Sequence, residues 1–159
     1  MGSLTATPKE PAPYDQWKQH VETALAGMSG PVLLVGHSVG AAILAKCLTE
    51  MDVDQPVAGI FLLSTPFWGG AGWQYEGYQQ LELPSDFAAR WPQEAPVFLY
   101  HSQDDAIVPF RHLALYARTL PRATIRAFAR GGDQLNNDLT VIANDIITLE
   151  EQPAQARTS

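Results

Sequence analysis

The sequence predicts an α/β fold in which about four parallel strands are flanked by helices. Continuous apolar runs, typical of strands that are covered on both faces, alternate along the chain with segments whose apolar residues recur at helical spacing. Such alternation favours a parallel sheet with right-handed connections. With 159 residues, of which 46% are hydrophobic and 17% charged, the chain has the size and composition of one globular domain.

The predicted elements follow one another in order. Residues 1–13, which include three prolines, are expected to form an irregular lead-in to a domain at 14–150. Strands are expected over 31–36, 57–64, 97–101 and 124–128, and helices over 14–26, 39–51 and 110–120. Residues 65–95, rich in aromatic residues, glycine and proline, are expected to form a long excursion with short helices.

A last helix is expected after Asn137, which can cap it. Its apolar stripe comprises Leu139, Ile142, Ala143, Ile146 and Leu149. Residues 151–159 are polar and are expected to form a flexible tail.

Charge and composition disfavour several classes of partner. The formal net charge of −7 opposes binding to nucleic acid or to an anionic membrane surface. The sequence shows neither a membrane-spanning apolar run nor a signal peptide, so a cytoplasmic location is expected. A lone Cys47 excludes an internal disulfide and a multi-cysteine metal site.

The strongest chemical signal is the G-x-S-x-G motif at residues 36–40, between a predicted buried strand and a predicted helix. A serine on such a sharp turn needs small neighbours, and the turn exposes its hydroxyl at the carboxyl edge of the sheet. Ser38 is therefore the candidate nucleophile, and the amide of Val39 is a candidate oxyanion donor. The alternative is an incidental glycine-rich turn.

A second signal, the D-x-x-V-P segment that starts at Asp105, follows the third predicted strand. Its carboxylate is expected at the carboxyl edge of the sheet, where it could orient a catalytic base. Asp104 is the alternative for this role, although it also suits a cap or turn.

The position where a catalytic histidine is expected, after the fourth strand, holds Asp133. A carboxylate there adds like-charge repulsion beside Asp105 and shuttles protons poorly near neutral pH. For all four histidines a structural role is favoured over that of a substitute base. His37 belongs to the elbow, where the side chain before the nucleophile is expected to point away from the site of attack. His101 is expected to be a strand-end residue packed under the site, His112 a helix residue and His20 a surface residue.

In order and spacing, GHSVG, HSQDDAIVP and GGDQLNND resemble small α/β hydrolases of the retinoblastoma-binding protein 9 type, from about Tyr14 to Leu149. The resemblance implies a truncated α/β-hydrolase fold with a catalytic Ser38 and Asp105, and places the family's histidine at Asp133. By the same resemblance, the family's opening strand and second oxyanion loop are expected to be missing. The predicted strand at 31–36 is therefore expected to need a cover, from residues 1–13, a second copy or another partner.

Two functions remain open. The first is a serine esterase that hydrolyses a small-molecule ester, impaired by Asp133, with substrate contacts from His37, Trp68 and Trp73. The aromatic excursion would then serve as a lid, or alternatively as a structural cap. The second is a non-catalytic or inactivated form that acts as a binding domain. No cofactor and no metal are expected, because neither a phosphate-binding glycine loop nor paired metal-ligand histidines occur.

Overall fold

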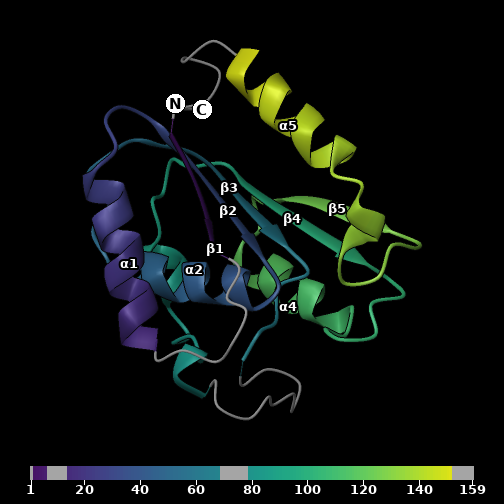
Figure 1. Cartoon of the computed structure of the whole chain (residues 1–159). Helices are drawn as coiled ribbons and strands as arrows, with labels where there is room; N and C mark the ends of the chain where they lie inside the picture. The colour runs from purple at the N-terminus through teal and green to yellow at the C-terminus, as the bar shows by residue number, and fades with distance from the viewer. Residues whose placement is uncertain (1, 7–13, 69–78, 152–159) are drawn as a thin grey trace.

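A computed structural model describes residues 2–6, 14–68 and 79–151. Its centre is a parallel sheet with strands in the order in which they occur along the chain (Figure 1). The strands are β1 (Gly2–Ala6), β2 (Val32–His37), β3 (Val57–Leu63), β4 (Val97–Ser102) and β5 (Thr124–Phe128). The predicted α/β class with a parallel sheet and the four predicted strands are all confirmed, and β1 is an additional strand.

Helices connect the strands and cover both faces of the sheet. They are α1 (Tyr14–Ala26), α2 (Val39–Glu50), α3 (Phe87–Arg90), α4 (Arg111–Thr119) and α5 (Thr140–Glu151), with short 3₁₀ turns η1 (Gln79–Leu81) and η2 (Leu135–Asn137). The predicted excursion at 65–95 contains η1 and α3, so its short helices are confirmed; Trp73 and the rest of 69–78 lie outside the described residues.

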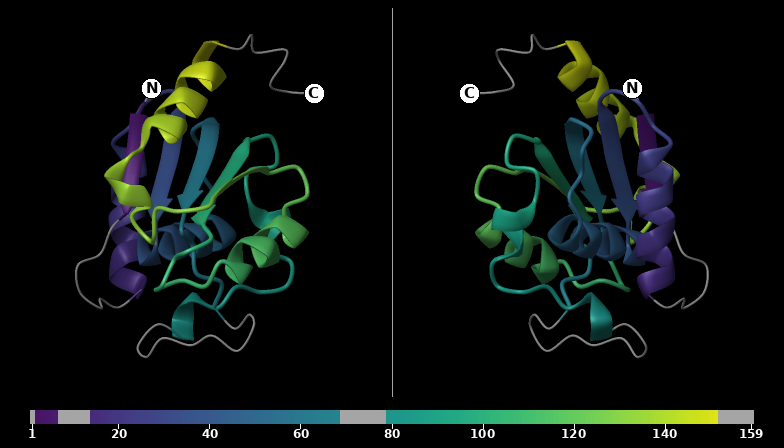
Figure 2. Two further views of the ribbon diagram at one scale, coloured as in Figure 1. Left: turned by 90° about the vertical axis from the view of Figure 1, so that its right-hand side faces the viewer. Right: turned by 90° about the vertical axis from the view of Figure 1, so that its left-hand side faces the viewer.

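The two faces of the sheet are covered by different helices. In Figure 2, α5 lies apart from the other large helices. Alternate residues of the strands, such as Leu34 and Leu62, pack with α1, α2 and α4 in the main core. The intervening residues, such as Phe61, pack with Ile142 and Leu149 of α5 in a smaller core. This alternation follows from the period of two along a strand.

The prediction of an irregular lead-in is wrong for residues 2–6, which form β1. This strand pairs in parallel with β2, from Gly2 opposite Val32 to Ala6 opposite Gly36. A buried parallel strand needs partners for its backbone groups on both sides, and a short segment of mixed composition can supply them through its own backbone. Of the three covers predicted for β2, the chain's own N-terminal segment is the one observed.

The start of α5 also differs from its prediction. Asp138, not Asn137, caps the helix: its Oδ1 accepts hydrogen bonds from the Thr140 N–H at 3.0 Å and the Thr140 hydroxyl at 2.6 Å. Asn137 has a left-handed φ of 58° in η2, so the helix begins later than expected. The apolar stripe is correspondingly narrower, because Leu139 precedes the helix and is exposed, and Ala143 is exposed within it.

The C-terminal boundary moves slightly, since α5 continues through Glu151. The remainder of the predicted tail, 152–159, lies outside the described residues. Among the helices that the structure describes, none has the length and apolar character required to cross a membrane.

Candidate active site

Ser38 lies on a sharp turn between β2 and α2, with φ 55° and ψ −126°. This is a conformation that non-glycine residues adopt rarely, and it is typical of strained functional turns. The turn also requires a glycine at position 36, because a Cβ there would lie 2.6 Å from the Cα of Ala41. A hydrogen bond of 2.8 Å from the Ser38 N–H to the Leu63 carbonyl fixes the turn against β3.

Val39 is the first residue of α2, so its N–H belongs to the first turn, where backbone donors have no acceptor within the helix. The Ser38 carbonyl already accepts hydrogen bonds from the N–H groups of Ala41 and Ala42, at 3.0 and 3.2 Å. The helix therefore begins immediately after Ser38, and its positive end faces the region of the serine. This placement suits the predicted oxyanion donor.

Asp105 lies at the carboxyl end of β4 and is almost fully buried. Its Oδ1 accepts hydrogen bonds from the N–H groups of Ile107 and Val108, both at 2.9 Å. Its Oδ2 lies 3.2 Å from Nε2 of His101, and that nitrogen also lies 2.9 Å from the Val108 carbonyl oxygen. The carboxyl group is thus held rigidly, and His101 is a buried strand-end residue beneath it, as predicted.

The loop with Asp133 follows β5 and begins with two glycines of positive φ. Gly131 has φ 136°, and a Cβ there would lie 2.8 Å from Oγ of Ser102. Gly132 has φ 60°, and its N–H donates a hydrogen bond of 2.8 Å to Oδ1 of Asp104. The loop therefore lies close against the end of β4, which places Asp133 at the same edge of the sheet as Ser38.

Two side chains from other strands contact the main-chain carbonyl of Asp133. The Ser64 hydroxyl donates a hydrogen bond to it at 2.9 Å, and Nε2 of His37 lies 2.6 Å from it. The same nitrogen lies 3.7 Å from Oδ2 of the Asp133 side chain. His37 thus contacts the loop that follows β5, although it belongs to the elbow.

The electrostatic surroundings of Asp133 connect the three predicted catalytic residues. Burial and the nearby carboxylate of Asp105 raise the pKa of Asp133, while the charge of His37 and a side-chain hydrogen bond with Ser38 lower it. The net direction is upward. The structure therefore brings Ser38, Asp105 and Asp133 together, and a carboxyl group is what lies beside the serine hydroxyl.

The other predicted residues lie elsewhere. His20 is exposed on α1, as predicted. His112 is buried and its Nδ1 accepts a hydrogen bond of 2.7 Å from the Phe67 N–H; burial lowers the pKa of His112 to about 4. Trp68 is 3% exposed and packs in the main core, which favours the structural interpretation of this part of the excursion.

Three contacts in this site were not predicted from the sequence as contacts of the Asp133 loop: those of Ser64, Asp104 and His37. Each of the three residues lies at or just beyond the carboxyl end of a predicted strand, and polar residues at that edge were the available signal.

Within residues 2–6, 14–68 and 79–151, no group of three or more His, Cys, Asp or Glu side chains is placed to bind a metal ion.

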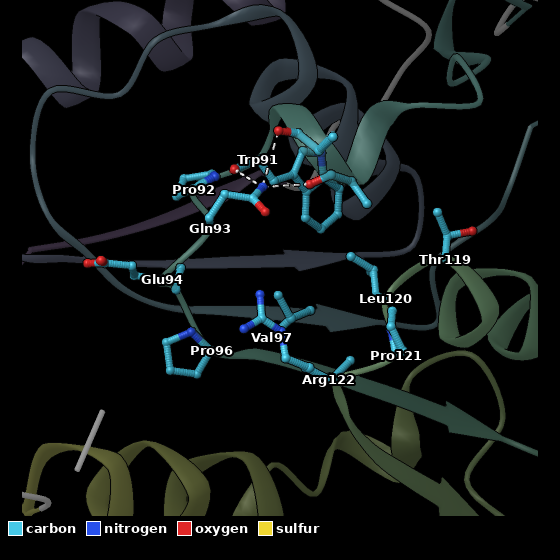
Figure 3. Close-up of a pocket in the computed structure, with 14 residues that line it drawn as sticks. Trp91, Pro92, Gln93, Glu94, Pro96, Val97, Thr119, Leu120, Pro121 and Arg122 are labelled. Atoms are coloured by element: carbon cyan, nitrogen blue, oxygen red, sulfur yellow. Dashed lines mark hydrogen bonds between the residues drawn. The ribbon is translucent and has the colours of Figure 1, made fainter. Parts of the chain in front are cut away.

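A pocket of about 430 Å³ lies at the opposite edge of the sheet, around the amino ends of β4 and β5 (Figure 3). Its lining includes Trp91, Pro96, Leu120 and Arg122. The Gln93 amide donates hydrogen bonds to the carbonyls of Ala88, Ala89 and Trp91, which closes one wall. In open parallel sheets ligands bind at the carboxyl ends of strands, so this pocket is separate from the candidate active site.

A parallel sheet with a serine on a glycine-dependent turn before a helix is typical of α/β hydrolases. Residues 5–136 match the model of the family described as Serine hydrolase. The chain belongs to this family.

Solved structures show the same fold at low sequence identity. The ydeN gene product from B. subtilis is 17% identical, with a TM-score of 0.71 over 89% of this chain and 77% of that one. Est1E from Butyrivibrio proteoclasticus is 13% identical, with a TM-score of 0.66 over 89% and 72%. SOBER1 from Arabidopsis thaliana is 20% identical, with a TM-score of 0.63 over 91% and 68%. No curated protein matches the sequence of this chain.

Proposed function

We propose that the chain is a carboxylic ester hydrolase that uses Ser38 as its nucleophile and acts on small acyl esters. The observation that supports this most strongly is the backbone conformation of Ser38, which has a φ of 55° on the turn between β2 and α2. This turn requires a glycine at position 36, because any Cβ there would clash with Ala41. Residues with backbone strain of this kind cluster at active sites, ligand-binding segments and switch regions.

In the proposed reaction, Ser38 Oγ attacks the ester carbonyl carbon while its proton passes to the carboxylate of Asp133. The Val39 N–H donates a hydrogen bond to the oxyanion that forms. The alcohol leaves with the proton from Asp133, and an acyl group remains on Ser38. Water then attacks the acyl carbon, gives its proton to Asp133, and the acid is released as Ser38 regains its hydrogen.

We further propose that turnover is impaired, because Asp133 occupies the position of the histidine in hydrolases of the retinoblastoma-binding protein 9 type. A carboxylate of ordinary pKa is a weaker base than imidazole, and its pKa lies below a working pH near neutrality. The buried Asp105, with its Oδ1 fixed by two backbone N–H groups, would normally face an imidazolium. Here it faces another acid, and burial together with the charge of Asp105 raises the pKa of Asp133.

The alternative proposal is a non-catalytic member of the family that binds a partner or ligand. The carboxyl group at position 133 supports it, since a triad without its imidazole loses most of its rate. The two proposals differ in one measurable respect. An impaired enzyme still acylates Ser38, whereas a binding domain does not.

Steady-state hydrolysis of p-nitrophenyl acetate and butyrate tests the proposal. We expect slow turnover above the background rate that is abolished in Ser38→Ala. Ser102→Ala is the matched control, because that serine is buried at the end of β4 and bonds weakly to the Arg130 carbonyl at 3.4 Å. Turnover that is equal in the wild type and Ser38→Ala would exclude Ser38 as the nucleophile and favour the alternative.

A further inference from the structure

His37 and Asp133 are 96 positions apart in the sequence, yet they form one of the closest side-chain contacts of the site. Nε2 of His37 lies 2.6 Å from the Asp133 carbonyl oxygen and 3.7 Å from Asp133 Oδ2. A carbonyl oxygen accepts but cannot donate, so Nε2 is the protonated nitrogen of the ring. The imidazole N–H therefore donates to the backbone carbonyl of Asp133 and lies close to its carboxyl group.

Ser64 provides an internal comparison, because its hydroxyl donates to the same carbonyl at 2.9 Å. Either donor can fix the main chain of the loop. Only His37 can also place a positive charge beside the Asp133 carboxyl group. Comparing variants of Ser64 and His37 can therefore separate the effect of fixing the loop from the effect of the positive charge.

The charge of His37 is the largest of the effects that lower the pKa of Asp133. Burial and the carboxylate of Asp105 both favour the protonated acid, and His101 at the end of β4 opposes them less than His37 does. Asp104 contacts the loop at the Gly132 N–H. A protonated Asp133 could not accept the proton of Ser38.

We propose that His37 is a positioning residue for Asp133: it holds the loop after β5 through the main-chain carbonyl and, when charged, keeps the neighbouring carboxylate ionised beside Ser38. Its effect on turnover rests on the proposed function, but its effect on Asp133 does not. Part of the role of the missing imidazole is thereby supplied from the residue that precedes the nucleophile.

The test is an NMR titration of the Asp133 side-chain ¹³Cγ in the wild type, His37→Gln and Ser64→Ala. Glutamine keeps a neutral donor and removes the charge. We expect the titration midpoint of Asp133 to move to higher pH in His37→Gln and to stay at the wild-type value in Ser64→Ala. Equal midpoints in the wild type and His37→Gln, or an equal shift in both variants, would overturn the proposal.

A second variant keeps the proposal testable if His37→Gln does not fold. Asparagine at position 37 also lacks the positive charge, so the titration midpoint of Asp133 should again move to higher pH in His37→Asn. An unchanged midpoint in a folded His37→Asn protein would equally overturn the proposal.

Ester hydrolysis then tests the consequence for the reaction. At the pH where wild-type Asp133 is half ionised, kcat of His37→Gln should fall by about two- to tenfold with little change in KM. If the titration shifts as expected but no variant and no wild-type protein hydrolyses esters, the proposed function fails while the role of His37 stands.

Discussion

The elbow around Ser38 and the loop around Asp133 form the two halves of the site, and they are built in different ways. The elbow is mostly local: its geometry depends on residues 36–41, on the absence of a Cβ at position 36, and on a single backbone hydrogen bond from Ser38 to Leu63. The loop is positioned by contacts from Asp104, Ser64 and His37, which belong to other segments. The backbone conformation of a locally built turn does not require a particular side chain on a distant loop, so we expect the backbone of the elbow to tolerate substitutions at residue 133.

The largest expected effect comes from placing an imidazole on the loop. Asp133→His should raise kcat/KM for p-nitrophenyl esters by about 10²- to 10⁴-fold, the usual contribution of a positioned general base. Asp105 would then face an imidazolium and stabilise it. Asp133→Asn is the control and should not raise the rate. An Asp133→His protein that folds but is no faster would show that more than the base is missing.

The next effect tests how strictly the elbow depends on glycine. Gly36→Ala should lower the free energy of unfolding by about 1–3 kcal/mol, because the new Cβ would meet the backbone of Ala41. Urea denaturation measures this. Gly27→Ala, where a Cβ would make only ordinary contacts at 3.6 Å or more, is the matched control. Equal stability of the two variants would contradict the tight turn.

A smaller effect is expected from an anchor of the loop. Asp104→Ala removes the acceptor of the Gly132 N–H, which should cost about 0.5–1.5 kcal/mol of unfolding free energy. The exposed loop residue Asp52, changed to alanine, is the control and should have little effect. Urea denaturation of both variants measures the difference. If the denaturation midpoints of Asp104→Ala and Asp52→Ala coincide, the contact between Asp104 and Gly132 does not stabilise the fold.

The smallest effect concerns the dependence of stability on pH. The pKa of Asp133 is raised in the folded protein, mainly by burial, so the folded state binds this proton more tightly and loses stability as pH rises through that pKa. Asp133→Asn removes this loss, and should be more stable than the wild type at pH 7 but not at pH 3. Urea titrations at both values measure the difference. A variant that is less stable at pH 7 would contradict the upward shift.

The sequence was sufficient for the elements whose signal is local. The buried run at 31–36 and the small residues that follow it predicted β2 and α2, and the glycines around Ser38 predicted the turn. Asp105 was equally visible, because the carboxylate and the strand before it are adjacent in the chain.

Features that depend on distant partners could not be predicted in this way. Residues 2–6 become a strand because the exposed backbone of β2 needs a partner, and their own composition gives no strong strand signal. The cap of α5 shifts to Asp138 because residues 135–137 adopt left-handed conformations in a loop fixed by tertiary contacts. The contact of His37 with Asp133 joins residues whose proximity follows only from the complete sheet.

Covalent labelling tests the assignment of the nucleophile most directly. The protein is treated with a fluorophosphonate, and the adduct is located by mass spectrometry of its peptides. We expect one adduct on Ser38, which disappears in Ser38→Ala, persists in Ser102→Ala and forms faster in Asp133→His. A folded protein that stays unlabelled even as Asp133→His, or that is labelled on another serine, would contradict the assignment of Ser38 as the nucleophile.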